Sequence, residues 1–291
     1  MFKILKKEEL APNIWLMDVE APRIAASALP GQFLIVRVDE EGERIPLTIC
    51  DYDKEKGTIT IVFQTIGAET YRMALLNVGD HFADVVGPLG NPSDLAKLPL
   101  EELRSKKILF IAGGVGTAPV YAQLKWLKQQ GVTADCIQGA RSENILILLD
   151  EMAAVSNLYI STDDGSRGIA GNVCVALQKL WDEGHRYDVV IVIGPMIMMK
   201  FACQLTKKLE IPTVVSMNTI MVDGTGMCGA CRLMVGGKVK FACVDGPEFD
   251  GHLVDFDQAM QRSRLYKTEE GRRLLAFQEG KTHEGGCGYC K

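Results

Sequence analysis

Short runs in which apolar and polar residues alternate dominate residues 1–97. Alternation with a period of two is typical of strands with one buried face, and it occurs at 14–19, 32–38, 58–63 and 81–86, with turn residues between the runs. A helical spacing of apolar residues occurs here only around 68–76. The pattern predicts a small antiparallel barrel of about five or six strands that closes near residues 87–90.

The pattern of apolar and polar residues changes at residue 107, after a linker-like segment at 91–107 that carries two prolines. Apolar runs rich in β-branched residues then alternate with helical segments of about 10 to 15 residues. The expected strands are 107–112, 133–138, 158–162, 187–193 and 213–217, and the expected helices are 119–130, 170–182 and 196–209. Strands that are apolar throughout and separated by helices predict an α/β domain with a doubly wound parallel sheet.

These patterns divide the chain into four parts. We expect a β-barrel at 1–97, an α/β domain at 104–215, a glycine- and cysteine-rich subdomain at 216–262, and a tail at 263–291 that begins as a helix over 263–278. The third part is too short to build a core of its own. The length of 291 residues agrees with about two full domains.

Composition narrows the classes of function. A hydrophobic fraction of 47% is ordinary for a globular protein, and the net charge of −5 argues against a nucleic-acid or anionic-membrane partner. No apolar run reaches the ~18 residues of a membrane helix, and the first residues do not resemble a secretory signal. Nine unevenly placed cysteines suit metal binding in a reducing compartment better than a disulfide framework, so we expect a cytoplasmic protein.

The most specific motif lies in the third part. Asp223, Cys228, Cys231 and Cys243 follow the spacing D-x4-C-x2-C-x11-C, which is the plant-type [2Fe–2S] pattern with aspartate in the first place. Three thiolates and one carboxylate predict a [2Fe–2S] centre whose oxygen ligand favours ferric iron. There are three alternatives. The residues could form a structural zinc site, they could be buried thiols beside a turn aspartate, or they could hold a cluster with Asp223 next to the iron rather than bound to it.

A second motif is a hydrophobic strand that runs into a glycine-rich turn and then a helix. Such a turn lets backbone approach a pyrophosphate at a helix N-terminus, which predicts a dinucleotide site. A second glycine turn follows a later strand of the same sheet. The residues assigned to the site by these two turns are Gly113, Gly114, Val115, Gly116, Thr117, Ala118, Gly194, Pro195 and Met196. A tight turn without a ligand is the alternative.

Two further residues follow strands between these turns. Arg141 is placed to meet a ribose or a 2′-phosphate, and Asp163 ends the next strand. No acidic residue ends the strand at Gln138, so the choice between NADH and NADPH stays open. A surface ion pair is the alternative for Arg141.

A third motif lies in the barrel. Arg44 offers a planar fork for phosphate and Thr48 a hydroxyl, and residues 67–70 form a helix start of the kind that binds anions. An edge strand and a simple helix cap explain the same residues without a ligand.

Along the chain the barrel motif comes first, the nucleotide motif second and the cysteine motif last. This order resembles the ferredoxin reductase superfamily, and more closely the electron-transfer subunit of dihydroorotate dehydrogenase and its relatives, over about residues 5–260. The resemblance implies FAD in the barrel, NAD(H) in the α/β domain with NADP(H) not excluded, and a [2Fe–2S] cluster. It implies no general acid or base. The residues it assigns to FAD are Arg44, Pro46, Leu47, Thr48, Val62, Phe63, Gln64, Gly67, Ala68 and Thr70.

Two departures from the dihydroorotate type look instead like the small subunit of the electron-bifurcating NADH-dependent reduced ferredoxin:NADP oxidoreductase. The first ligand is Asp223, and 48 residues follow Cys243. The implied partner is a larger iron–sulfur flavoprotein subunit in a heterodimer or larger complex, with ferredoxin involved indirectly. A subunit for dihydroorotate or sulfide chemistry is the alternative, and a zinc-binding, nucleotide-sensing module is a distant one. Cys287 and Cys290 are expected to be inert thiols in a tail.

Overall fold

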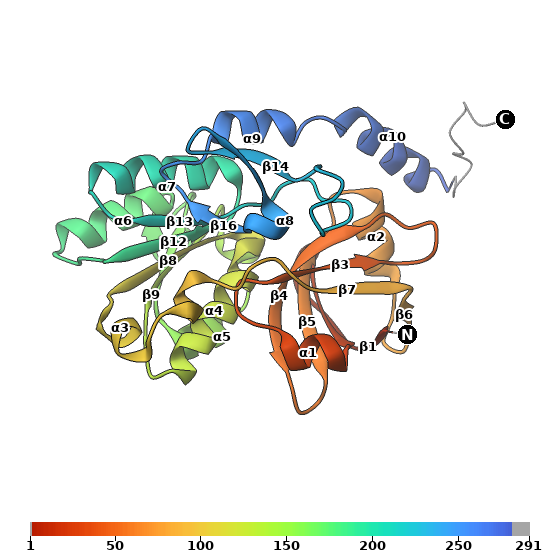
Figure 1. Cartoon of the computed structure of the whole chain (residues 1–291), viewed down its shortest axis with the longest axis horizontal. Coiled ribbons are helices and arrows are strands. Elements are labelled where there is room, and N and C mark those ends of the chain that lie inside the picture. The colour runs from red at the N-terminus through yellow and green to blue at the C-terminus, as the bar shows by residue number, and fades with distance from the viewer. Residues whose placement is uncertain (1, 281–291) are drawn as a thin grey trace.

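The computed structural model describes residues 2–280. In Figure 1 a barrel lies to the right, an α/β layer structure lies to the left, and the C-terminal part runs across the top of both. The predicted Cys287 and Cys290 fall outside the described residues. No helix within residues 2–280 combines the length and the apolarity that crossing a membrane requires.

The N-terminal sheet has seven antiparallel strands in the order β6-β1-β2-β5-β4-β3-β7 and curls into a nearly closed barrel. Its strands are β1 (Phe2–Ala11), β2 (Ile14–Glu20), β3 (Phe33–Arg37), β4 (Ile45–Asp53), β5 (Thr58–Gln64), β6 (His81–Phe82) and β7 (Asp84–Leu89). Two short helices, α1 (Pro22–Ser27) and α2 (Ala68–Leu75), complete it. Alternate side chains such as Met17, Ile61 and Phe63 fill the interior, as the period-two pattern predicts.

The barrel has more strands than the five or six expected. The alternation missed β1 because half of its side chains are charged and most of its residues are at least partly exposed, so that no apolar face shows in its sequence. It missed β4 because its first four residues, which include Pro46, are all half-buried and show no alternation. Both strands form because each pairs with a strongly apolar neighbour, β1 with β2 and β4 with β5.

The second sheet also has seven strands, in the order β11-β10-β9-β8-β12-β13-β16. All pairings are parallel except that of β16 with β13. The strands are β8 (Ile108–Gly113), β9 (Asp135–Ala140), β10 (Asn157–Thr162), β11 (Ile169–Ala170), β12 (Val189–Ile193), β13 (Thr213–Ser216) and β16 (Glu248–Asp250). The predicted fold class, a barrel followed by a doubly wound parallel sheet, is therefore what the chain adopts.

Helices cover both faces of this sheet. One face packs on α4 (Thr117–Gln129) and α5 (Leu149–Val155), and the other on α6 (Val173–Asp182) and α7 (Met196–Lys208). Strand β8 serves both cores, because Ile108 and Phe110 face one and Leu109 and Ile111 face the other. The segment expected as a linker contains the short helices η1 (Asp94–Lys97) and α3 (Leu100–Ser105).

The C-terminal part contacts both the barrel and the α/β domain. It contains the hairpin β14 (Arg232–Val235) and β15 (Lys238–Phe241), the turn of helix α8 (Ala242–Asp245), and the helices α9 (Phe256–Arg262) and α10 (Lys267–Gln278). Strand β16 adds to the edge of the parallel sheet, whereas α10 crosses to the barrel and packs on α2. The expected helix over 263–278 begins only at Lys267, because residues 263–266 form the turn between α9 and α10.

Candidate functional site

The loop before β14, called the cluster loop here, carries Asp223, Cys228 and Cys231, and helix α8 carries Cys243. The four predicted ligands form two pairs: the Cys228 Sγ lies 3.3 Å from the Asp223 Oδ1, and the Cys231 Sγ lies 3.2 Å from the Cys243 Sγ. Cys228 is exposed and Asp223 partly so, whereas Cys231 and Cys243 are each 2% exposed. The first pair is therefore at the surface and the second is buried.

Local backbone geometry shapes this loop. Gly224 has a φ of +76° and Gly226 a φ of +86°, a region that residues with a side chain rarely adopt. Asp223 turns its carboxylate back into the loop and accepts hydrogen bonds from the backbone N–H groups of Thr225 (3.1 Å) and Cys228 (3.2 Å). The Thr225 N–H, with the contacts from Cys228, lowers the pKa of Asp223, so that the carboxylate is ionised and available as a ligand.

The arrangement in pairs matches the ligand pattern of a two-iron centre. Each iron of a [2Fe–2S] cluster takes two protein ligands, whereas a structural zinc ion takes four donors around one point. Burial, together with the neighbouring Cys231 thiol, raises the pKa of Cys243 to about 12, so the Cys243 thiol ionises readily only with a cation present. The residues fit a two-iron cluster.

The glycine turns predicted to bind a dinucleotide meet at the carboxyl edge of the parallel sheet. Gly113 ends β8, and Gly194 follows β12, the neighbouring strand. A methyl group on Gly194 would lie 3.1 Å from the Gly113 Cα, and one on Gly116 would overlap the Ile193 carbonyl oxygen. Only glycine permits this contact between the two turns, and Gly116 and Gly194 are partly exposed at the position where parallel sheets bind ligands.

The remaining residues of this edge differ in accessibility. Arg141 and Asp163 are exposed and lie on adjacent strand ends, since the Asp163 N–H donates to the Ala140 carbonyl at 3.0 Å. Thr117 and Ala118 are buried instead, and the Thr117 hydroxyl has no hydrogen-bond partner within residues 2–280. These two residues therefore lie beneath the surface of this edge.

The residues assigned to FAD lie along β4, β5 and the start of α2. Pro46, Leu47 and Thr48 are half-buried on β4 opposite β3. Val62 and Phe63 on β5 are buried in the hydrophobic cores, while Gln64 is exposed.

The start of α2 is already capped from within. The Thr70 hydroxyl oxygen accepts hydrogen bonds from the N–H groups of Ile66 (2.9 Å) and Gly67 (3.1 Å), and donates to the Gly67 carbonyl (2.8 Å). This cap already uses the Gly67 N–H, which is one of the donors that an anion site at residues 67–70 would need. Ala68 is buried directly behind it, with 7% of its surface exposed.

Arg44 joins the barrel to the loop with the predicted cluster ligands. Its Nε donates a 2.7 Å hydrogen bond to the Val222 carbonyl, and its Nη1 lies 3.5 Å from the Asp84 Oδ2. Sequence reasoning assigned Arg44 to a phosphate and missed this role, because 178 positions separate Arg44 from Val222 and no local pattern marks the contact.

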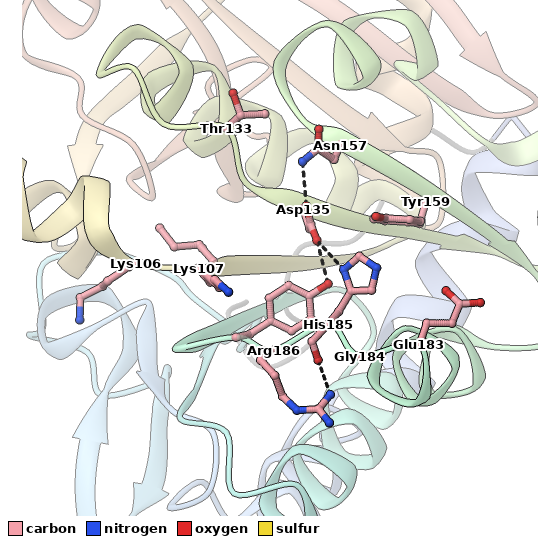
Figure 2. Close-up of a pocket in the computed structure, with 12 residues that line it drawn as sticks. Lys106, Lys107, Thr133, Asp135, Asn157, Tyr159, Glu183, Gly184, His185 and Arg186 are labelled. Carbon is pink, nitrogen blue, oxygen red and sulfur yellow. Dashed lines mark hydrogen bonds and ion pairs between the residues drawn. The ribbon is translucent and has the colours of Figure 1, made fainter.

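A hollow of about 490 Å³ lies at the opposite, amino edge of the parallel sheet, where no motif predicts a site. In Figure 2, Asp135 occupies its centre and accepts hydrogen bonds from Asn157 (2.9 Å) and the Tyr187 hydroxyl (2.8 Å), with the His185 Nδ1 at 3.5 Å. The polar groups therefore satisfy one another. This arrangement suits a structural cluster that fixes the strand starts.

Other cysteines are structural. Cys50, Cys136 and Cys203 are at most 5% exposed, and burial raises the pKa of each thiol. Cys174 is half-buried. None of these four thiols contributes to the cluster loop.

Glu248 is a second residue that sequence reasoning missed. Its carboxylate accepts hydrogen bonds from the Ser93 hydroxyl (2.9 Å) and the Gln123 amide (2.7 Å), so β16 is joined to the segment after the barrel and to α4. Burial raises the pKa of this carboxyl. A lone glutamate in a short strand carries no sequence signal for such a role.

Comparisons with known proteins agree with this geometry. Residues 218–255 match the sequence model of the iron-sulfur cluster binding domain of dihydroorotate dehydrogenase B. The chain is 32% identical over 252 residues to the dihydroorotate dehydrogenase B (NAD(+)) electron transfer subunit of Streptococcus pneumoniae, covering 85% of this chain and 97% of that protein. The chain belongs to the family of dihydroorotate dehydrogenase B electron-transfer subunits.

Two other members of this group are more similar. A homolog of the dihydroorotate dehydrogenase B electron transfer subunit from Thermotoga maritima is 42% identical over 268 residues, or 92% of each chain. A chain from the solved NADH-dependent reduced ferredoxin-NADP oxidoreductase is 40% identical and superposes with a TM-score of 0.88, covering 96% of this chain and 98% of that one. The resemblance predicted from the motifs is confirmed.

Proposed function

We propose that this chain is the electron-transfer subunit of an NADH-dependent reduced ferredoxin:NADP oxidoreductase. In that role it exchanges electrons between NAD(H), FAD, a [2Fe–2S] cluster and a larger iron–sulfur flavoprotein subunit. The observation that carries the proposal is the paired arrangement of Asp223 with Cys228 and of Cys231 with Cys243. The similarity to the solved oxidoreductase over nearly the whole chain supports the choice of complex.

The proposal assigns each cofactor to one part of the chain. FAD belongs to residues 1–97, the nicotinamide nucleotide to 104–215 and the cluster to 216–262, with 263–291 as a helical tail. Asp223 and Cys228 would hold one iron, and Cys231 and Cys243 the other. When bound, FAD exchanges a hydride for single electrons, and the cluster carries one electron at a time.

The chain's own residues bind and orient these groups. The partly exposed turns at Gly116 and Gly194 would hold the nucleotide phosphates, with Gly113 buried beside them and Arg141 at the adjacent strand end. The backbone N–H groups that point at Asp223 fix the direction of its carboxylate. We assign no general acid or base to the chain, because positioning suffices for this chemistry.

A subunit of a dihydroorotate dehydrogenase complex is the second candidate, because the names of the Streptococcus and Thermotoga relatives favour it. A subunit for sulfide chemistry shares the same site. Anaerobic purification from the native organism, followed by mass spectrometry of stoichiometric partners, separates them. A large iron–sulfur flavoprotein with a pyridine-nucleotide domain supports our proposal, whereas a dihydroorotate dehydrogenase catalytic subunit contradicts it.

A direct assay tests the cofactors in the same preparation. We expect bound FAD, two irons and two acid-labile sulfides per chain, and loss of the flavin absorbance on anaerobic addition of NADH. Zinc without sulfide would instead support the nucleotide-sensing alternative. Flavin that NADH does not bleach would rule out entry of hydride through this chain.

A further inference from the structure

The loop between β3 and β4, residues 38–44, contacts the C-terminal part at two separate places. At its end, the Arg44 guanidinium donates to the carbonyl of Val222, the residue directly before Asp223. One residue earlier, the Glu43 carboxylate forms an ion pair with Arg273 on α10, with 2.7 Å between the Glu43 Oε1 and the Arg273 Nη1. This barrel loop therefore lies between the cluster loop and the C-terminal helix.

A buried carboxylate extends the contact beneath the loop. Glu69 on α2 is 2% exposed and pairs with Arg72 at 3.1 Å, and the Arg273 Nη2 lies 3.9 Å from the same carboxylate. Arg72 also pairs with Asp39, at the other end of the loop. The charges of α2, α10 and the loop thus form one network that fixes the loop at both of its ends.

Helix α10 depends on these contacts. None of its residues is fully buried, and a helix of 12 residues is marginal in water without tertiary support. Its support is the stacking of Phe277 on Tyr71, with ring centroids 6.2 Å apart, together with the Arg273 ion pairs. Because α10 packs on α2, the C-terminal part contacts the barrel at a second place, in addition to the contact between Val222 and Arg44.

The cluster loop also contacts the barrel at Gly224. A methyl group there would lie 2.8 Å from the Ile35 Cδ1 and 2.8 Å from the Leu89 Cδ1, on strands β3 and β7. The loop that carries Asp223 is therefore seated directly on the barrel. Two contacts therefore join this loop to the barrel: the packing of Gly224 on Ile35 and Leu89, and the hydrogen bond from Arg44 to the Val222 carbonyl.

From these contacts we propose that Arg273 is a positioning residue for electron transfer. It acts through Glu43 on the loop that ends in Arg44, and so holds the cluster loop at a fixed place against the flavin barrel. This inference rests on the proposed function, because it assigns the distance between the bound flavin and cluster to the network. Loosening the network lengthens that distance and slows electron transfer, while hydride entry at the flavin is unchanged.

A charge reversal tests the proposal better than a deletion. The Arg273 and Glu43 side chains are 39% and 45% exposed, and removing an exposed ion pair has little effect. Arg273→Glu instead places a third carboxylate beside Glu43 and Glu69. The exposed Arg272 next to it provides a matched control, since Arg272→Glu makes the same charge change away from the network.

The experiment uses the full chain with its cofactors, in complex with its partner, mixed anaerobically with NADH. Flavin bleaching is followed by stopped-flow absorbance, and cluster reduction by freeze-quench electron paramagnetic resonance. We expect Arg273→Glu to slow cluster reduction roughly three- to tenfold and to leave bleaching unchanged, because electron transfer slows as donor and acceptor move apart and a small displacement of a positioned group slows the step that depends on it. The double variant Glu43→Lys/Arg273→Glu should recover most of the rate.

Hydrogen exchange provides a readout that does not depend on activity. Arg273→Glu should increase amide exchange in α10 and in residues 38–44, and Arg272→Glu should not. Unchanged exchange, or increased exchange with an unchanged rate of cluster reduction, would overturn the proposal. A wild-type chain that binds neither flavin nor iron would instead contradict the proposed function itself.

Discussion

Gly224 provides a test of how the cluster loop is seated. The change Gly224→Ala has two costs that the structure separates. At a φ of +76° an alanine is strained by about 1–2 kcal/mol. Its methyl group would also contact Ile35, which is 1% exposed, and Leu89, at 2.8 Å each, and overpacking of this kind costs about 1–3 kcal/mol. We therefore expect a loss of about 2–5 kcal/mol.

Gly237→Ala is the matched control. Gly237 has a similar φ of +73°, but a methyl group there meets nothing within 4 Å. It should cost only the backbone strain of about 1–2 kcal/mol. Urea unfolding of both variants beside the wild type, followed by circular dichroism, measures the difference in free energy of unfolding.

A second measurement connects the packing to the site. Gly224 is adjacent to Asp223, so a loop displaced from Ile35 and Leu89 should release iron faster to a chelator than the wild type does. Gly237→Ala should release iron at the wild-type rate. Equal destabilisation by the two variants, within about 0.5 kcal/mol, would refute the claim that the loop is packed on the barrel.

Three other changes probe the remaining sites. Asp223→Ala should change the electron paramagnetic resonance spectrum of the reduced cluster or abolish the cluster, and an unchanged spectrum would rule out Asp223 as a ligand. Gly116→Ala, whose methyl group would overlap the Ile193 carbonyl oxygen, should weaken NADH binding by about tenfold or more in an equilibrium titration; unaltered affinity would remove this turn from the site. Burial raises the pKa of Glu248, so the folded chain keeps this proton to higher pH than the unfolded chain does. The contribution of this carboxyl to the stability of the wild type therefore falls as the pH rises above about 4.5. Glu248→Gln should therefore gain stability relative to wild type between pH 4 and pH 7.5, and urea midpoints that differ by the same amount at both values would contradict the argument.

The sequence predicts this fold wherever burial leaves a pattern. Strands such as β8, apolar on both faces, are recognisable because each side chain meets a core. Strand β1 escapes prediction because its charged side chains face solvent and its pairing with β2 decides its conformation. Local spacing therefore reveals elements with a buried face and misses those held by partners.

In the candidate site, too, local spacing reveals some residues and misses others that are held by distant partners. Asp223, Cys228 and Cys231 lie within nine residues, so their spacing records the chemistry that they share. The bond from Arg44 to Val222 and the network around Arg273 join residues that are far apart in sequence. Such contacts depend on how α10 and the barrel meet, which no local pattern contains.

The register of β16 has a consequence for the assembly of the cluster. Ser216 pairs with Glu248 across β13 and β16, so residues 217–247 leave the sheet and return to the same place. Because the ends of this excursion are closed by the sheet, the entropy of closing the loop is already lost before any iron arrives. Binding of the cluster therefore does not have to bring the two ends of this excursion together, because the β13–β16 pairing already does so.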